Sequence, residues 1–247
     1  MLFVMSRNQV SLIIAEAALE VVPKEIRGHP SVKNHALRLG KKPNEILLDR
    51  SFHHTAMISG KLKLAWKRGR PDITHFALIE ALSTPLYIRG MLRVYIHTID
   101  DKAILIGEKL RIPKSYFRFE GLMMKLYKDK TIRNNEGNKT LLELHDNTTF
   151  QYLIKNIVKP DKLIGLTSLG VQSTAEEVIL KNNIDNKNND NNNHCAFIVG
   201  GFPKGHFSTY TSKLFYCSYS IEQFALESHV VIARILYECE KVLSVHC

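Results

Sequence analysis

A short apolar run that continues directly into a glycine-rich loop constrains this chain more than any other stretch. Residues 197–207 read FIVGGFPKGHF, with no polar turn residue between the apolar run and the glycines. Glycine has no side chain, so such a loop can press its backbone closely against another surface. The pattern predicts a buried strand whose exit loop either approaches a ligand or makes only a tight structural turn.

Two familiar nucleotide-binding motifs do not account for this loop. Gly200 and Gly205 have the spacing of a P-loop, but His206 and Phe207 stand where that motif has lysine and serine or threonine. The glycines also miss the G-x-G-x-x-G spacing of dinucleotide-binding folds. A magnesium-dependent nucleotide hydrolase is therefore disfavoured.

The charge balance favours a polyanionic partner. The 247 residues include 34 Lys and Arg against 24 Asp and Glu, a net charge of +10. No separate basic tail carries this excess, which favours nucleic acid over a membrane. No apolar run approaches the ~18–20 residues of a membrane span. We therefore expect an intracellular protein with no membrane partner.

Neither the cysteines nor the histidines predict a metal site. The four cysteines form no C-x-x-C pair, so free thiols in a reducing compartment are expected. His53 and His54 are adjacent, but no third ligand is identifiable near them.

Two basic segments are candidate RNA contacts. Residues 61–70 place five cations around Trp66, which suits phosphate pairing and base stacking; a solvated segment with Trp66 in the core fits equally well. In a helix after Arg111, at ~100° per residue, a second set of cations would share one face around Gly121. The cations of this set are Lys114, Arg118 and Lys125. Such a face often serves only solubility, but together with the first segment it suggests an RNA track.

The remaining pattern predicts an α/β protein with a parallel or mixed sheet covered by helices. Strands are expected in the first half of 10–22, at 45–48, in a hairpin of 92–99 and 103–106, and at 141–144, 163–169 and 196–199. Helices are expected at 30–39, from 71 to about 84, after 114, at 150–157, at 175–180 and from about Ile221, with a further short element at 213–217. The last helix has an apolar stripe that fits the core and is long enough to meet a second subunit. The asparagine-rich tract 182–194 is expected to be disordered.

Several longer motifs, in order, make the chain resemble the Nep/Emg family of small-subunit rRNA pseudouridine methyltransferases. They are GRPDITH at 69–75, VYIHT at 94–98, RIPK at 111–114, RFEGLM at 118–123 and the loop at 200–205. GHPS at 28–31 and LLDRS at 47–51 resemble the shorter archaeal branch. The likeness covers nearly the whole chain apart from the asparagine-rich tract.

This resemblance implies a SPOUT-class α/β fold whose C-terminal segment forms a trefoil knot, a rare topology. It implies a single domain over 1–247 with a helix and hairpin insertion at about 57–112, and a homodimer formed through the knot region. The implied activity is methylation of a ring nitrogen of one pseudouridine in a small-subunit rRNA hairpin loop, with S-adenosylmethionine as donor. The protein would act on the pre-ribosomal small subunit, in the cytoplasm or, in a eukaryote, the nucleolus. The alternative is a ribosome-assembly RNA-binding factor in which methyl transfer is secondary or absent.

The resemblance also implies a set of cofactor-binding residues in three loops. They are Thr167, Gly200, Gly201, Phe202, Gly205, His206, Phe207, Tyr216, Cys217, Ser218, Tyr219, Ser220 and Ile221. The last loop departs from the family's usual Leu-Ser-x-Tyr-Pro-Leu, because Ser220 replaces the proline while Tyr219 and Ile221 are retained.

The implied RNA-binding residues are Arg70, Arg111, Lys114 and Arg118. Lys114 stands where the family often has arginine, which keeps the charge but loses the bidentate fork. Arg70 and Asp72 are the candidate catalytic pair, with the flipped pseudouridine held between them and the cofactor loop. Positive charge there would favour the deprotonated base. Asp72 is expected to orient Arg70 before acting as a general base, because a carboxylate paired with arginine is a poor proton acceptor.

Overall fold

The structure is a computed structural model that describes residues 10–184 and 194–243. Within them, eight strands form one sheet in the order β4-β5-β3-β2-β1-β7-β6-β8. The five strands from β2 to β8 are parallel neighbours, whereas β3, β5 and β4 extend the sheet antiparallel. The strands are β1 (Val10–Ala17), β2 (Leu92–Thr98), β3 (Ala103–Ile106), β4 (Thr131–Arg133), β5 (Thr140–His145), β6 (Lys162–Gln172), β7 (Cys195–Gly200) and β8 (Cys217–Ser220).

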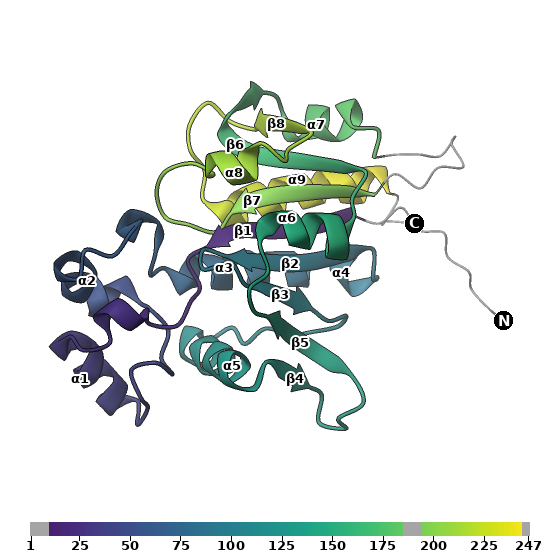
Figure 1. Ribbon diagram of the computed structural model, residues 1–247. Coiled ribbons are helices and arrows are strands. Elements are labelled where there is room, and N and C mark those ends of the chain that lie inside the picture. Colours follow the sequence, from purple (N-terminus) through teal and green to yellow (C-terminus); the bar gives the residue numbers. More distant parts are fainter. Residues whose placement is uncertain (1–9, 185–193, 244–247) are drawn as a thin grey trace.

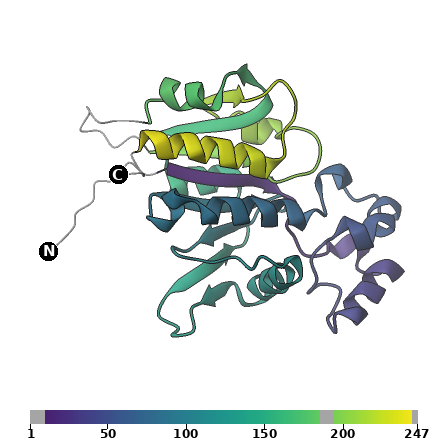
Figure 2. The ribbon, with the colours of Figure 1, turned by 180° about the vertical axis from the view of Figure 1, so that it is seen from behind.

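Helices cover both faces of the sheet. The helices are α1 (Pro30–Arg38), α2 (Arg50–Ser59), α3 (Pro71–Ser83), α4 (Pro85–Ile88), α5 (Tyr116–Asp129), α6 (Phe150–Tyr152), α7 (Ala175–Lys181), α8 (Thr209–Ser212) and α9 (Ser228–Val242), with the short turns η1 (Lys24–Ile26) and η2 (Ala65–Lys67) and the π-helix η3 (Leu153–Val158). On one face α3 and α9 lie side by side, with α5 beyond them (Figure 2), and α6 and α8 lie on the other face (Figure 1). None of the described helices is both long and apolar enough to cross a membrane.

β1 lies at the centre of the sheet and is buried on both sides, mainly through its apolar residues. All eight of its residues are buried. Leu12 and Ile14 belong to the larger core cluster and Ile13 and Ala15 to the smaller one, as expected for side chains that alternate between two faces. Burial on both faces is typical of parallel strands covered by helices.

The parallel strands end at one edge of the sheet, and this edge positions the candidate site. In Figure 1 it is the left edge, where the loops after β1 and β7 lie beside the small lobe that contains α1 and α2. In open α/β sheets, ligands bind in the crevice beyond the carboxyl ends of the strands.

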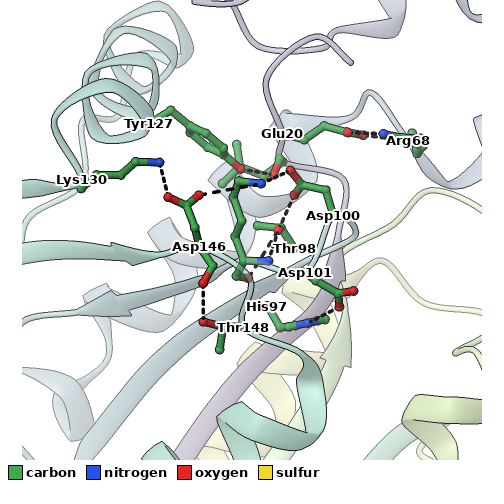
Figure 3. A network of polar contacts seen from close by, with 12 residues as sticks. Glu20, Arg68, His97, Thr98, Asp100, Asp101, Tyr127, Lys130, Asp146 and Thr148 are labelled. Atoms are coloured by element: carbon green, nitrogen blue, oxygen red, sulfur yellow. Dashed lines mark hydrogen bonds and ion pairs between the residues drawn. The ribbon is translucent and has the colours of Figure 1, made fainter. Parts of the chain in front are cut away.

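The predicted hairpin at 92–99 and 103–106 is confirmed as β2 and β3, and its turn is held by polar contacts (Figure 3). Asp100 accepts a hydrogen bond from Thr98 Oγ1 at 2.6 Å and pairs with Lys102 Nζ at 2.6 Å. Asp146, after β5, pairs with Lys130 at 2.6 Å and ties the antiparallel end of the sheet to the same network. These contacts give Asp100 and Asp146 a structural role at this end of the sheet.

Three expected elements were wrong. Residues 45–48 form only an isolated bridge between Val21 and Leu47, because they pair with a short irregular segment and not with the sheet. The last helix begins at Ser228 and not near Ile221. The short element at 213–217 is replaced by β8, which begins at Cys217.

Two expectations remain predictions. Within 57–112, β2 pairs with the central strand and α3 packs beside α9, and the division into one domain with an insertion stays a prediction. Of the asparagine-rich tract, residues 185–193 lie outside the described residues.

Candidate functional site

A cavity of about 350 Å³ lies at the carboxyl ends of β7 and β8 and beside the middle of β6. Its size is within the range of small-molecule sites, ≈ 300–1,000 Å³. Nine of the residues expected to bind a cofactor line it: Thr167, Gly200, Phe202, Gly205, His206, Phe207, Tyr219, Ser220 and Ile221. The three predicted segments therefore meet, although Thr167 lies within β6 and Tyr219 and Ser220 lie within β8.

Gly201 does not line the cavity because it packs against β1 instead. Its N–H donates to the carbonyl of Ala15 at 2.9 Å, and its carbonyl accepts from the N–H of Ala18 at 2.8 Å. A Cβ at this position would lie 2.8 Å from both Ala17 and Ile14. Gly201 thus permits a close approach between the loop and β1, and touches no ligand space.

Tyr216, Cys217 and Ser218 do not line the cavity either. Tyr216 donates its N–H to the carbonyl of Leu163 at 2.8 Å, and its side chain is 68% exposed. The thiol of Cys217 faces Asn182 Oδ1 at 3.6 Å. These residues belong to the start of β8, whereas the cavity lies at its end, so the strand itself keeps them away.

Further residues that were not predicted line the cavity, and more than half of them follow β8. The additional lining residues are Leu166, Ser168, Val199, Pro203, Lys204, Glu222, Phe224, Ala225, Leu226, Ser228 and Val231. Residues 221–227 form a loop over the cavity, and Ser228 Oγ donates to the carbonyl of Gly200 at 2.6 Å where α9 begins. Apolar residues at helical spacing had suggested a core helix there, yet Phe224 is 64% exposed.

Arg70 and Asp72 form a corner beside this loop. Arg70 Nη2 donates to Asp72 Oδ2 at 2.7 Å and Arg70 Nε to Oδ1 at 2.8 Å, so the predicted pairing is confirmed. The hydrogen bond to Asp72 raises the pKa of Arg70 above its ordinary value against the effect of burial, and the charge of Glu227 adds to the rise. The rings of Phe76 in α3 and His229 at the start of α9 have centroids 5.8 Å apart, and the adjacent Ser228 lines the cavity, so α3 packs beside the cavity where α9 begins.

A second set of contacts fixes the 111–118 segment against α3 and the α2 lobe. His75 Nε2 lies 2.7 Å from the carbonyl of Pro113, and the His75 ring stacks on Phe119 with centroids 4.4 Å apart. The hydroxyl of Tyr116 donates to Asp49 Oδ2 at 3.0 Å, while Asp49 Oδ1 caps α2. These contacts therefore fix the backbone that carries Arg111, Lys114 and Arg118.

Arg111, Lys114 and Arg118 are all exposed, and none forms an ion pair within the described part of the chain. Lys114 precedes α5, which begins at Tyr116, so it is not on the helix face. Farther along α5, a second cavity of about 320 Å³ is lined by Lys41, Glu45, Gly121, Met124, Lys125, Lys128 and Asp129. The exposed cations therefore extend beyond Arg118 into a lysine-lined groove.

The basic segment 61–70 separates into buried and exposed members. Lys67 is buried and pairs with Glu16 at 2.6 Å, and Arg68 pairs with Glu20. Trp66 is 52% exposed, so the interpretation that placed it in the core is wrong. Lys67 and Arg68 are therefore unavailable as surface contacts for RNA.

His53 contacts another histidine inside the α1–α2 lobe. Its Nε2 lies 3.0 Å from His35 Nδ1, and its Nδ1 accepts from the N–H of Asp49 at 3.1 Å. Burial and the neighbouring His35 lower the pKa of His53 to about 4. Among the described residues, no cluster of three metal-ligating side chains is present.

The known proteins that this chain resembles in sequence and in structure all belong to one family. A family model described as EMG1/NEP1 methyltransferase matches residues 12–240. The protein named ribosomal RNA small subunit methyltransferase Nep1 from Saccharolobus solfataricus is 40% identical over 95% of this chain and 98% of its own length. Its namesake from Thermococcus sibiricus is 43% identical over 79% of this chain and 83% of its own. The crystal structure of Archaeoglobus fulgidus Nep1 bound to S-adenosylhomocysteine is similar with a TM-score of 0.81 and 34% identity, covering 96% of this chain and 99% of that one.

Proposed function

This chain belongs to the EMG1/NEP1 methyltransferase family, and we propose that it transfers a methyl group from S-adenosylmethionine to small-subunit rRNA. The acceptor in this proposal is a ring nitrogen of a pseudouridine in a hairpin loop. The observation that carries it is a small-molecule cavity beside the start of α9, together with the Arg70–Asp72 pair on the neighbouring α3 and the exposed cations around α5.

The lining of the cavity fits an adenosylmethionine-like molecule. Phe202, Ile221 and Leu226 offer apolar walls, and glycines leave backbone N–H and C=O groups accessible to the edges of an adenine. Lys204 and Glu222 supply one charge of each sign, which suits the carboxylate and ammonium groups of the methionine portion. Glu222 is held by Arg234 Nη1 at 2.9 Å.

The RNA side of the proposal rests on Arg70, Arg111, Lys114 and Arg118, with Lys125 and Lys128 as a continuation along α5. Cations that neutralise phosphates provide affinity and position without reading sequence. Gly121 leaves open space between Arg118 and Lys125, since nothing lies within 4 Å of where its Cβ would be. A phosphate can therefore approach the helix backbone closely there.

The bound cofactor supplies an electrophilic methyl group; the residues of this chain supply position and charge. Holding donor and acceptor in contact geometry accounts for much of the acceleration of such transfers. Arg70 stabilises negative charge on the base as its ring N–H proton passes to solvent water, and Asp72 keeps the guanidinium in place through two hydrogen bonds. Asp72 thus acts as an orienting residue.

The assembly is part of the same proposal. We infer a homodimer, supported by the exposed apolar residues Leu169 and Val171 in β6 and Tyr216 just before β8. Membership of the family is the ground for inferring a knotted C-terminal segment. The protein would act on the pre-ribosomal small subunit in the cytoplasm. A stable interface commonly buries ≈ 1,200–2,000 Å² in total, which sedimentation or light scattering would report as a dimer mass.

A matched pair of substitutions tests the cavity. Ala225 is exposed and lines it, whereas Gln223 is exposed and does not. Ala225→Trp should abolish binding of S-adenosylhomocysteine in calorimetry, while Gln223→Trp should bind it as the wild type does. Equal binding by both variants would contradict the proposal, and an RNA-binding protein without cofactor affinity would indicate an assembly factor instead.

A further inference from the structure

The end of β1 has an unusual backbone at Glu16. Its φ is +51°, and the pairing of β1 with β2 shifts register between Ile14 and Ala17. A glutamate in this left-handed region is uncommon and persists only where its surroundings hold it. Glu16 is also buried, so its carboxylate needs partners.

Both partners of Glu16 lie outside β1. Glu16 Oε2 pairs with Lys67 Nζ at 2.6 Å, and Glu16 Oε1 accepts from the N–H of Ser208 at 2.7 Å. Burial by itself raises the pKa of Glu16, but the hydrogen bonds from Lys67 and Ser208 outweigh it, and the resulting pKa lies below the ordinary value. Glu16 is therefore an ionised carboxylate at neutral pH.

Lys67 makes a second set of contacts with the glycine-rich loop. Its ammonium donates to the carbonyl of His206 and lies 4.1 Å from the centroid of the Phe202 ring. The backbone at Gly205, with φ +89°, passes over Trp66 and Lys67, and a Cβ there would be 3.6 Å from Lys67 Cε. The Glu16 and Lys67 side chains are only 9% and 7% exposed. One buried ion pair thus holds the loop 202–208 at Phe202, His206 and Ser208.

We propose that Glu16 and Lys67 are positioning residues that set the shape of the 202–208 loop and so the affinity of the cavity for its cofactor. This inference rests on the proposed function of that cavity. Phe202, His206 and Phe207 line it, and their loop is fixed by a pair that itself does not line it. Arg70 lies three residues after Lys67, so the same short segment also links the cofactor loop to the Arg70–Asp72 corner.

The next residue offers a matched control. Arg68 pairs with the buried Glu20 and also donates to the carbonyl of Lys63, so it makes a comparable ion pair from the same segment (Figure 3). Neither Arg68 nor Glu20 lines the cavity or bonds the glycine-rich loop. Loss of this pair should lower stability without altering the loop.

The test compares Lys67→Met with Arg68→Met, since methionine keeps most of the aliphatic stem and removes the charge. Both should lower the melting temperature, because Lys67→Met leaves the carboxylate of Glu16 without its cation and Arg68→Met does the same to Glu20. Only Lys67→Met should weaken S-adenosylhomocysteine binding, by about tenfold or more, with the affinity for an rRNA hairpin nearly unchanged. Glu16→Gln serves where Lys67→Met folds poorly: hydrogen exchange at the Ser208 amide should quicken in Glu16→Gln and stay slow in Arg68→Met.

The outcomes are distinguishable. If the wild type does not bind S-adenosylhomocysteine, the proposed function itself is wrong. If the wild type binds and Lys67→Met binds equally well, or loses no more affinity than Arg68→Met, the pair only stabilises the fold and the inference is overturned. Unchanged exchange at Ser208 in Glu16→Gln would overturn it as well.

Discussion

Gly201→Ala tests how the cofactor loop is seated on the central strand. The methyl group would lie 2.8 Å from the Cα and Cβ of Ala17 and 2.8 Å from Ile14 Cγ2. Real Cβ contacts do not reach such distances, and the neighbours are backbone and buried side chains that cannot rotate away. The loop or β1 must therefore move.

Overpacking of this kind costs about 1–3 kcal/mol. In a protein of this size each kcal/mol lowers the melting temperature by about 2–4 °C, so we expect a fall of roughly 2–12 °C. Because the displaced loop also lines the cavity, S-adenosylhomocysteine should bind more weakly. Differential scanning calorimetry and titration calorimetry measure the two effects.

Gly28→Ala is the matched control, because nothing lies within 4 Å of its Cβ position and its φ is not positive. It should leave both the melting temperature and the cofactor affinity unchanged. If Gly201→Ala behaved like Gly28→Ala, the close approach of the loop to β1 would be refuted as the reason for glycine there.

Other substitutions test the surface and the lobe. Arg70→Ala should weaken rRNA-hairpin binding while leaving S-adenosylhomocysteine affinity nearly unchanged, and an equal loss of both would contradict separate roles. Lys125→Ala should lower RNA affinity and reduce the slope of log K against log salt by roughly 0.7–0.9, whereas an unchanged slope would exclude a phosphate contact. Gly121→Ala should raise the free energy of unfolding by ~1 kcal/mol, because this helical glycine has room for a methyl group; no gain would contradict that space. The pKa of His53 in the folded protein is about 4, below the ordinary 6.5 of the unfolded chain. The contribution of neutral His53 to the free energy of unfolding is therefore complete above about pH 6.5 and is lost as the pH falls toward 4. His53→Asn should flatten the pH dependence of stability in that window by up to roughly 3 kcal/mol, and an unaltered dependence would contradict a buried neutral ring.

The elements that could be predicted were those with an unambiguous period. The alternation at 92–99 and 103–106 predicted β2 and β3, and Pro30 and Pro71 correctly marked the starts of α1 and α3. The expected strand at 45–48 was wrong because a run of three apolar residues does not reveal whether a partner strand exists.

The sequence predicted the part of the candidate site that follows β7. It did not predict the parts whose position depends on tertiary packing. The loop 221–227 looked like a helix because a cavity wall and a helix face can carry the same apolar spacing. Lys67 looked like a surface cation because its partner, Glu16, is distant in sequence. Charge counting shows an excess of cations, but only the folded chain shows which of them are paired.

Methyl transfer to an rRNA hairpin tests the central claim most directly. The purified protein would be incubated with S-adenosylmethionine and two otherwise identical hairpins, one with pseudouridine and one with uridine in the loop. Mass spectrometry should find one added methyl group on the pseudouridine hairpin alone. A protein that binds cofactor and hairpin but methylates neither, or that methylates both equally, would contradict the account.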